Sequence, residues 1–283
     1  MKRKIYTWLQ YILPHRLLSS IVNSLMRVKW KPLKNLIINK ISKSYNVNMQ
    51  EAESSDINDY PHFNAFFTRK LKTGVRPIDK NVKSIISPVD GAISQCGKIK
   101  KGRIFQAKGF DFSVAELLAC DKKTEEYYQN GLFATIYLSP KDYHRMHAPI
   151  DCEVSKTVHI PGRLFSVAKW TAESIPRLFA RNERLVCYLE TEIGQIAYIL
   201  VGAIMVSSME TVFNGLVTPP YAKKVHEVPL NSNTKLSKGD EVGRFNMGST
   251  VILLFPAGVV ELDSGLIENK IVKLGEKIAT MLQ

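Results

Sequence analysis

The sequence predicts an α+β protein with a largely antiparallel β core, peripheral helices and a helical N-terminal part. From residue 84 onward, short apolar segments alternate with turn residues, the pattern of antiparallel strands. The first 50 residues instead carry apolar side chains at helical spacing. The chain has 283 residues, 45% of them hydrophobic, and can bury a large core without disulfides. No apolar run reaches the roughly 18 residues of a membrane-spanning helix.

Residues 1–50 are basic throughout. They contain ten Lys or Arg residues, whereas the first acidic residue is Glu51. The net charge of +13 therefore lies mainly in this segment, because basic and acidic residues are nearly balanced in the rest of the chain. A basic segment without acids favours an anionic partner surface.

The same segment is amphipathic. Leu17, Leu18, Ile21, Val22, Leu25 and Val28 follow helical spacing, and shorter apolar groups precede Pro14 and cover 33–41. Trp8, Tyr11 and Trp30 suit a lipid headgroup layer. These features predict helices that lie on an anionic membrane surface. The segment could also be a helix packed on its own domain, a nucleic-acid-binding arm or a cleaved transit peptide. We favour the membrane and expect no nucleic-acid partner.

The remaining elements follow in order. A polar stretch at 46–60 marks the junction between a helical region, 1–50, and a catalytic β-rich domain, 51–283. A short helix is expected within 61–80, ending near Gly74. Two more helices are expected at 113–120 and at the C-terminus, 277–283. The expected strand segments are 84–94, 102–109, 132–139, 152–160, 184–191, 196–212, 249–255 and 258–262.

The four cysteines suggest neither a disulfide framework nor a metal site. Cys96, Cys120, Cys152 and Cys187 are far apart in the sequence and form no C-x-x-C pair. Reduced thiols in a cytosol-facing protein are therefore expected.

Two histidines lie close together in the segment LSPKDYHRMHAP. Ser139 and Pro140 could begin a helical turn, which would place His144 and His147 on one side. A strand would instead point them to opposite faces. The H-x-x-H spacing also permits a metal pair, but no third ligand is evident nearby, and we expect no metal. Two histidines in a loop after a strand favour a functional role.

Two further segments complete a possible Ser-His-Asp set. Asp90 lies between Pro88 and Gly91, where an aspartate can also be only a turn former. Ser249 follows Gly248 directly and precedes an apolar strand. This arrangement does not fit the G-x-S-x-G turn of lipases, and by itself it could be a bulge at a strand start.

These segments occur together in an order that resembles the phosphatidylserine decarboxylase family. The resemblance runs from about residue 66 to the C-terminus. Its blocks include FFTRKLKTGVRPID, SPVDGAI, FQAKGFDFSVAELLA, YLSPKDYHRMHAP, IPGRLFSV, LFARNERLVC, VGAIMVSSMETV and KGDEVGRFNMGSTVILLF. The first 50 residues resemble the family in their basic, amphipathic character more than in any motif.

The resemblance implies a proenzyme that cleaves itself between Gly248 and Ser249. The products would be a β chain (1–248) and an α chain (249–283), which together form a heterodimer, with a dimer of these units expected. Asp90, His147 and Ser249 would form the relay for this step, with His147 taking the proton from the Ser249 hydroxyl.

The cleavage would convert Ser249 into a pyruvoyl group, so no external cofactor is expected. This group would form a Schiff base with phosphatidylserine and accept electrons as CO2 leaves, giving phosphatidylethanolamine. His144 is the candidate for proton transfer or for holding the substrate carboxylate. Lys108, Lys141 and Arg145 could meet the phosphate, but the sequence assigns none of them.

The implied protein is a carboxy-lyase bound peripherally to the cytoplasmic face of the cell membrane. Two alternatives remain open. A membrane-associated Ser-His-Asp hydrolase would stay a single chain and lack the ketone. A non-catalytic membrane or nucleic-acid binder would not need the intact set of Asp90, His147 and Gly248-Ser249.

Overall fold

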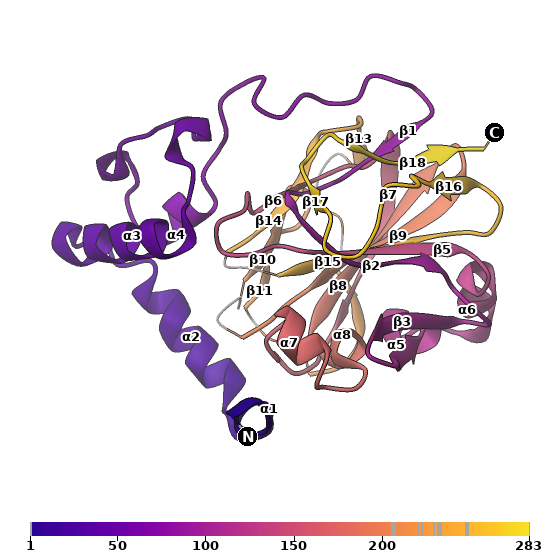
Figure 1. Cartoon of the computed structure of the whole chain (residues 1–283), viewed down its shortest axis with the longest axis horizontal. Helices are drawn as coiled ribbons and strands as arrows, with labels where there is room; N and C mark the ends of the chain where they lie inside the picture. Colours follow the sequence, from indigo (N-terminus) through magenta and orange to yellow (C-terminus); the bar gives the residue numbers. More distant parts are fainter. Residues whose placement is uncertain are drawn as a thin grey trace.

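A computed structural model describes residues 2–204, 208–219, 221, 223–228, 230, 234–246 and 249–282. The helices are α1 (Lys2–Ile12), α2 (His15–Leu25), α3 (Lys31–Tyr45), α4 (Phe63–Phe67), α5 (Val114–Leu118), α6 (Lys122–Tyr128), α7 (Lys169–Ala172) and α8 (Leu178–Arg181), with 3-10 turns η1 (Met49–Glu51) and η2 (Ile57–Asp59). Figure 1 shows α1 to α4 at one side of a β-rich body.

The strands make up that body. They are β1 (Ser84–Ile86), β2 (Gly91–Lys98), β3 (Arg103–Ala107), β4 (Phe110–Ser113), β5 (Leu132–Tyr137), β6 (Arg145–His147), β7 (Cys152–Ile160), β8 (Arg184–Thr191), β9 (Gly194–Val201), β10 (Met209–Thr211), β11 (Gly215–Thr218), β12 (His226–Val228), β13 (Lys235–Leu236), β14 (Glu241–Phe245), β15 (Thr250–Phe255), β16 (Val260–Leu262), β17 (Ile271–Val272) and β18 (Lys277–Met281). The α+β prediction is confirmed.

The largest sheet has nine strands in the order β12-β7-β8-β9-β15-β5-β2-β17, with β13 also paired to β7. A second sheet has the order β11-β10-β14-β6, a third β1-β18-β16, and β3 and β4 form a hairpin. All pairings between these strands are antiparallel. The nine-stranded sheet therefore supplies the main core.

Strand β15 lies at the centre of the large sheet. It pairs with β5 on one side and β9 on the other, and every residue from Thr250 to Phe255 is buried. A strand covered on both faces needs a continuous apolar run rather than alternation, and Val-Ile-Leu-Leu-Phe supplies it. Ser249 precedes this strand directly, so the large sheet fixes its position.

Gly91 begins β2 immediately after Asp90. A Cβ atom at this position would lie 2.5 Å from the carbonyl oxygen of Tyr137 in β5. Only glycine permits so close an approach of the two backbones. The glycine that the sequence suggests as a turn former therefore serves close strand packing beside Asp90.

A separate small core joins the N-terminal helices to α4. Ile38 of α3 packs with Tyr60, Phe63, Phe66 and Phe67, all of them buried. The helices α1 and α2 also touch the β body, because Tyr11 packs against Phe165 at 5.3 Å between ring centroids. No helix in the described part of the chain is long and apolar enough to cross a bilayer.

Several expected elements differ from the structure. The C-terminal segment 277–283, expected as a helix, contains strand β18, because Ile278, Ala279 and Met281 are buried between β1 and β16. Tertiary pairing outweighs local propensity here. The helix expected up to Gly74 ends at Phe67. The segment 196–212 is not one strand, because β9 ends at Val201 and β10 begins at Met209.

Candidate active site

Asp90 lies in the turn between β1 and β2, where an arginine holds it. Arg76 donates from Nε to Oδ1 and Oδ2 at 2.9 and 3.0 Å, and from Nη2 to Oδ2 at 2.6 Å. The backbone N–H of Leu274 donates to Oδ1 at 2.9 Å. Arg76 also donates to Glu51 at 2.6 Å. Burial opposes the charge on Arg76, but these carboxylates outweigh it and raise its pKa.

His147, at the end of β6, has both ring nitrogens engaged. Its Nδ1 lies 2.7 Å from the Gly239 carbonyl oxygen, and its Nε2 lies 3.2 Å from the Tyr143 hydroxyl. A carbonyl only accepts, so Nδ1 carries the proton and Nε2 presents a lone pair. Burial lowers the pKa of His147, which the Gly239 carbonyl partly opposes. The ring is therefore a neutral base at pH 7.

Ser249 is completely buried, and its Oγ has no hydrogen-bond partner among the described residues. Its carbonyl accepts from the backbone N–H of Leu138 at 2.9 Å, the first step of the ladder that continues along β15. The neighbouring Thr250 hydroxyl likewise lacks a partner in the described part of the chain. Gly248, the other residue of the expected cleavage site, lies outside the described residues.

His144 is fully buried, and neither ring nitrogen has a hydrogen-bond partner among the residues with a described placement. Its ring stacks on Phe67 of α4, with centroids 4.0 Å apart and planes at 18°. Burial, followed by the positive charge of Arg69, lowers the pKa of His144 to about 3. His144 is thus neutral over the whole physiological pH range. The backbone of Ser139 and Pro140 lies near the ring and partly opposes this shift.

The structure places these four residues on neighbouring segments. The backbone N–H of His147 donates to Pro88 at 2.9 Å, which sets β6 beside the turn that carries Asp90. The segment between β5 and β6 runs from Leu138, bonded to Ser249, to His144, and His147 ends β6. Within the described residues, however, no hydrogen bond joins the side chains of Asp90, His147 and Ser249. The charge of Asp90 still acts on His147, because it opposes part of the fall in the pKa of His147 that burial causes.

The expected helical turn at Ser139 does not place the two histidines. Asp142 accepts from both the N–H and the hydroxyl of Ser139, at 2.7 and 2.8 Å, which forms a turn without a helix. His147 ends strand β6 and His144 directly precedes that strand, so the helical alternative is wrong. The two residues have different surroundings: His144 packs against α4, whereas His147 lines a pocket.

That pocket has a volume of about 320 Å³. Its lining combines a basic rim with the groups around His147: Lys70, Leu71, Lys72, Thr73, Gly74, Arg76, Ile78, Tyr143, Arg145, His147, Gly239, Glu241 and Leu274. Arg145 donates to Glu241 at 2.7 Å and to the carbonyl of Thr68 at 3.0 Å, so its charge is already paired.

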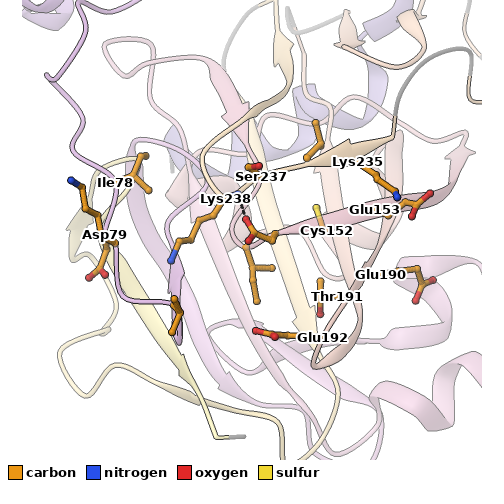
Figure 2. Close-up of a pocket in the computed structure, with 15 residues that line it drawn as sticks. Ile78, Asp79, Cys152, Glu153, Glu190, Thr191, Glu192, Lys235, Ser237 and Lys238 are labelled. Atoms are coloured by element: carbon orange, nitrogen blue, oxygen red, sulfur yellow. Dashed lines mark hydrogen bonds between the residues drawn. The ribbon is translucent and has the colours of Figure 1, made fainter.

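A larger groove of about 1060 Å³ lies elsewhere and contains none of the four candidate residues. Figure 2 shows its mixed lining, in which the backbone N–H of Lys238 donates to Asp151 at 2.6 Å. Acidic side chains such as Glu153, Glu190 and Glu192 share the groove with Lys235. Its lining has more acidic than basic side chains, and because it holds none of the candidate residues, the pocket beside His147 is the better candidate for the active site. Among the described residues, no three His, Cys, Asp or Glu side chains could hold a metal ion.

Sequence reasoning did not find Arg69, Arg76 or Tyr143. Arg76 holds Asp90, Tyr143 faces His147, and Arg69 lies near His144. Arg69 and Arg76 belong to the segment FFTRKLKTGVRPID, which carried part of the resemblance but no chemical motif. Only the folded chain shows which carboxylates and rings these side chains meet.

Comparison with known proteins gives one consistent result. A family model described as phosphatidylserine decarboxylase matches residues 63–280, and a second, described as PSD, matches residues 5–46. The chain is 47% identical over 279 residues to a protein of Ectopseudomonas mendocina, covering 98% of each chain. It is 48% identical over 288 residues to one of Pseudomonas putida, covering both chains fully. A Xanthomonas campestris protein is 47% identical over 276 residues, covering 97% of this chain and 98% of its own. All three are named phosphatidylserine decarboxylase proenzyme.

Proposed function

Because the chain belongs to the phosphatidylserine decarboxylase family, we propose that it generates its own catalytic carbonyl by cleaving the bond between Gly248 and Ser249. The protein is a decarboxylase, a carboxy-lyase that converts phosphatidylserine into phosphatidylethanolamine. Its relatives bear the name proenzyme, which is consistent with processing into two chains. The hydrolase alternative has no support from these relatives. The observation that carries the proposal is the buried hydroxyl of Ser249 at the start of the central strand, which has no hydrogen-bond partner among the residues that the structure describes.

His147 is the proposed base for self-cleavage. Its Nε2 lone pair can accept the proton of the Ser249 hydroxyl once the contact with Tyr143 gives way. The Gly239 carbonyl keeps the proton on Nδ1 and so maintains the required tautomer. Asp90 supports the imidazolium through its charge rather than through a direct hydrogen bond, and Arg76 holds it in place.

The proposed reaction balances as follows. The Ser249 Oγ attacks the Gly248 carbonyl carbon, the peptide C–N bond breaks, and an ester links the two parts of the chain. A base removes the α-proton of Ser249, and the ester C–O bond breaks to release residues 1–248 as a carboxylate. One water molecule then hydrolyses the remaining dehydroalanine to a pyruvoyl group and ammonia. No oxidant or external cofactor is required.

The buried surroundings of Ser249 are compatible with a pyruvoyl group at this position. A pyruvoyl carbonyl supplies an electron sink for the decarboxylation. Burial excludes bulk water, and His144, which stacks on Phe67, has no hydrogen bond at either ring nitrogen within the described residues. Since the pKa of His144 is about 3, its proposed role begins with a neutral N–H donated to the substrate carboxylate. A bound carboxylate would raise this pKa and prepare the ring to return a proton.

We also propose that residues 1–50 hold the enzyme on the cytoplasmic face of the cell membrane. The apolar side chains with the largest exposed fractions in this region are Trp8 (63%), Leu17 (60%), Trp30 (65%) and Leu36 (64%). Exposed apolar side chains within a basic segment support adsorption to anionic lipid. Lys34 is an exception, because it is buried and donates to the carbonyls of Ile57 and Tyr60.

Vesicle co-sedimentation tests this membrane role. Trp8→Ser with Leu17→Ser should weaken binding to vesicles that contain anionic phospholipid by at least tenfold, and added salt should weaken wild-type binding. Val82→Ser is the matched control, because Val82 is 81% exposed on the β body. Equal binding of both variants would exclude the N-terminal helices as the anchor. The proposed assembly, a dimer of processed heterodimers, is tested by light scattering.

The enzymatic proposal is tested with carboxyl-labelled phosphatidylserine. Wild-type protein should release labelled CO2, and borohydride with the substrate amine should trap a covalent adduct on the small chain. Ser249→Ala should remain a single chain of 32.0 kDa and release no CO2. An intact wild-type chain that reacts with a fluorophosphonate and cleaves esters would instead support the hydrolase.

A further inference from the structure

We propose that Arg69 binds the phosphodiester group of the lipid substrate, an assignment that rests on the decarboxylase function proposed above. The group it recognises is a permanent, singly charged phosphate ester next to a glycerol backbone. The proposal depends on three observations, namely the lack of a carboxylate in contact with Arg69 among the described residues, its place beside His144, and its contacts with segments that adjoin the N-terminal helices and Ser249.

The guanidinium of Arg69 is buried without an anion. The residue is only 4% exposed, and neither Nε nor Nη1 has a partner among the described residues. Its single side-chain hydrogen bond runs from Nη2 to the Lys141 carbonyl at 3.2 Å, and its plane lies over the ring of Phe66 at 5.5 Å. Burial also lowers the pKa of Arg69. A buried cation normally has a counter-charge in contact with it, and here the described chain supplies none.

Other arginines with little exposure differ from Arg69 in using their guanidinium nitrogens within the described chain, although Arg184 also meets carbonyls rather than a carboxylate. Arg76 donates to the carboxylates of Asp90 and Glu51. Arg145 donates to Glu241 and to the Thr68 carbonyl. Arg184 donates to the carbonyls of Leu117, Asn182 and Glu116. In Arg69, Nε, Nη1 and the second N–H of Nη2 therefore remain for a ligand, and Nη2 together with either Nε or Nη1 can hold two oxygens of one phosphate.

Arg69 lies beside the proposed chemistry. Phe67, two residues earlier, stacks on His144, and the charge of Arg69 contributes to lowering the pKa of that histidine. The Lys141 carbonyl that Arg69 meets belongs to the same segment as Leu138, which is hydrogen-bonded to the Ser249 carbonyl. An anion held by Arg69 would therefore lie close to a substrate bound at Ser249.

The chemistry of the reaction favours the phosphate over the substrate carboxylate. The carboxylate loses its charge as CO2 forms, so an ion pair with it would stabilise the ground state more than the transition state. The phosphate keeps its charge throughout, so an ion pair with it does not raise the activation barrier of the decarboxylation. The neutral His144 on Phe67 is the better neighbour for the carboxylate.

The position of Arg69 also matches the direction from which a lipid would arrive. It follows α4, whose phenylalanines pack on Ile38 of α3, and it donates to Lys141 in the segment whose Leu138 bonds to Ser249, so its contacts connect the proposed membrane helices with the neighbours of Ser249. Of the phosphate candidates from the sequence, Arg145 is paired with Glu241, and Lys108 lies 3.0 Å from Glu173.

The test uses soluble dihexanoyl phosphatidylserine, so that membrane binding does not affect the kinetics. Arg69→Met should raise KM about 10- to 100-fold and leave kcat within about threefold, because a uniformly bound group contributes to KM alone. Arg69→Lys, which keeps the charge but loses the fork, should fall between Met and wild type. Arg103→Met is the control, because it removes an exposed arginine of β3 and should change neither constant.

Direct binding of dihexanoyl phosphatidylmethanol, a singly charged phosphodiester, measured by calorimetry, separates this proposal from the enzymatic one. This probe has the phosphate and the glycerol but neither amine nor carboxylate. Wild-type protein should bind it, and Arg69→Met should weaken binding at least tenfold even in a preparation that releases no CO2. The assignment would be overturned if wild-type protein and Arg69→Met bound the probe equally, or if Arg69→Met lowered kcat without raising KM. Failure of both Arg69 variants to self-cleave would overturn it as well.

Discussion

Replacing Arg76 by methionine should strongly destabilise the protein. Arg76 makes three contacts to the Asp90 carboxylate and one to Glu51, at distances of 2.6 to 3.0 Å. The side chains of Arg76 and Asp90 are each only 8% exposed. Without the guanidinium, Asp90 would retain only the backbone N–H of Leu274 and would be a buried charge without a counter-charge.

The expected magnitude follows from this burial. Removing one partner of a buried ion pair costs about 3 to 5 kcal/mol, which corresponds to a fall in Tm of roughly 6 to 20 °C for a domain of this size. Asp90→Asn keeps an acceptor for Leu274 but carries no charge. The double variant Arg76→Met/Asp90→Asn should therefore be more stable than Arg76→Met alone, by about 1 to 3 kcal/mol.

Thermal and urea unfolding measure these differences, and gel electrophoresis measures self-cleavage in the same samples. Arg103→Met is the control, because its exposed pairs with Asp111 and Glu116 should contribute under about 1 kcal/mol. Arg76→Met should also cleave more slowly, since Asp90 loses the group that fixes it. The reasoning is refuted if Arg76→Met loses less than about 1 kcal/mol, or if the two substitutions are simply additive.

The remaining predictions concern titratable groups. The pKa of buried His144 is about 3, below its unfolded value of 6.5, so its neutral form stabilises the fold fully above pH 6.5 and this contribution is lost as the pH falls toward 3. His144→Phe should therefore flatten the pH dependence of unfolding between pH 6.5 and 4 by about 1.4 kcal/mol per pH unit, and unchanged slopes would contradict the assigned burial. Burial raises the pKa of Cys120 to about 11 and that of Cys152 to about 12. Iodoacetamide at pH 7.5 should leave both thiols unmodified in the folded protein, and rapid alkylation of Cys152 would show that it is accessible.

Pattern and composition predicted much of the fold. Apolar periodicity located the N-terminal helices, and the apolar run of 251–255 predicted a strand, which the structure shows as the fully buried β15. The C-terminal segment was predicted wrongly, because neighbouring strands determine its structure rather than its own propensity. Helix α4 ends earlier than its sequence suggests, since Thr68 and Arg69 turn toward the segment 139–147.

The candidate site was predictable only as a set of residue types. Ordered blocks of sequence singled out Asp90, His147, Ser249 and His144. Their hydrogen bonds could not be predicted, because the partners of each residue come from distant parts of the chain. Arg76 and Asp90 are 14 positions apart in the sequence, and Gly239 and His147 are 92 positions apart. A buried guanidinium without a carboxylate in contact among the described residues, such as that of Arg69, has no sequence signature at all.

Intact mass spectrometry of freshly purified wild-type protein tests the central claim most directly. Self-cleavage after residue 248 predicts two species, about 28 kDa and about 4 kDa, from the chain of 32.0 kDa. The smaller species should be lighter, by one ammonia molecule, than residues 249–283 with an ordinary N-terminal serine. A fully active preparation that contains only the uncut chain, or a small fragment that still carries its serine amine, would contradict the account.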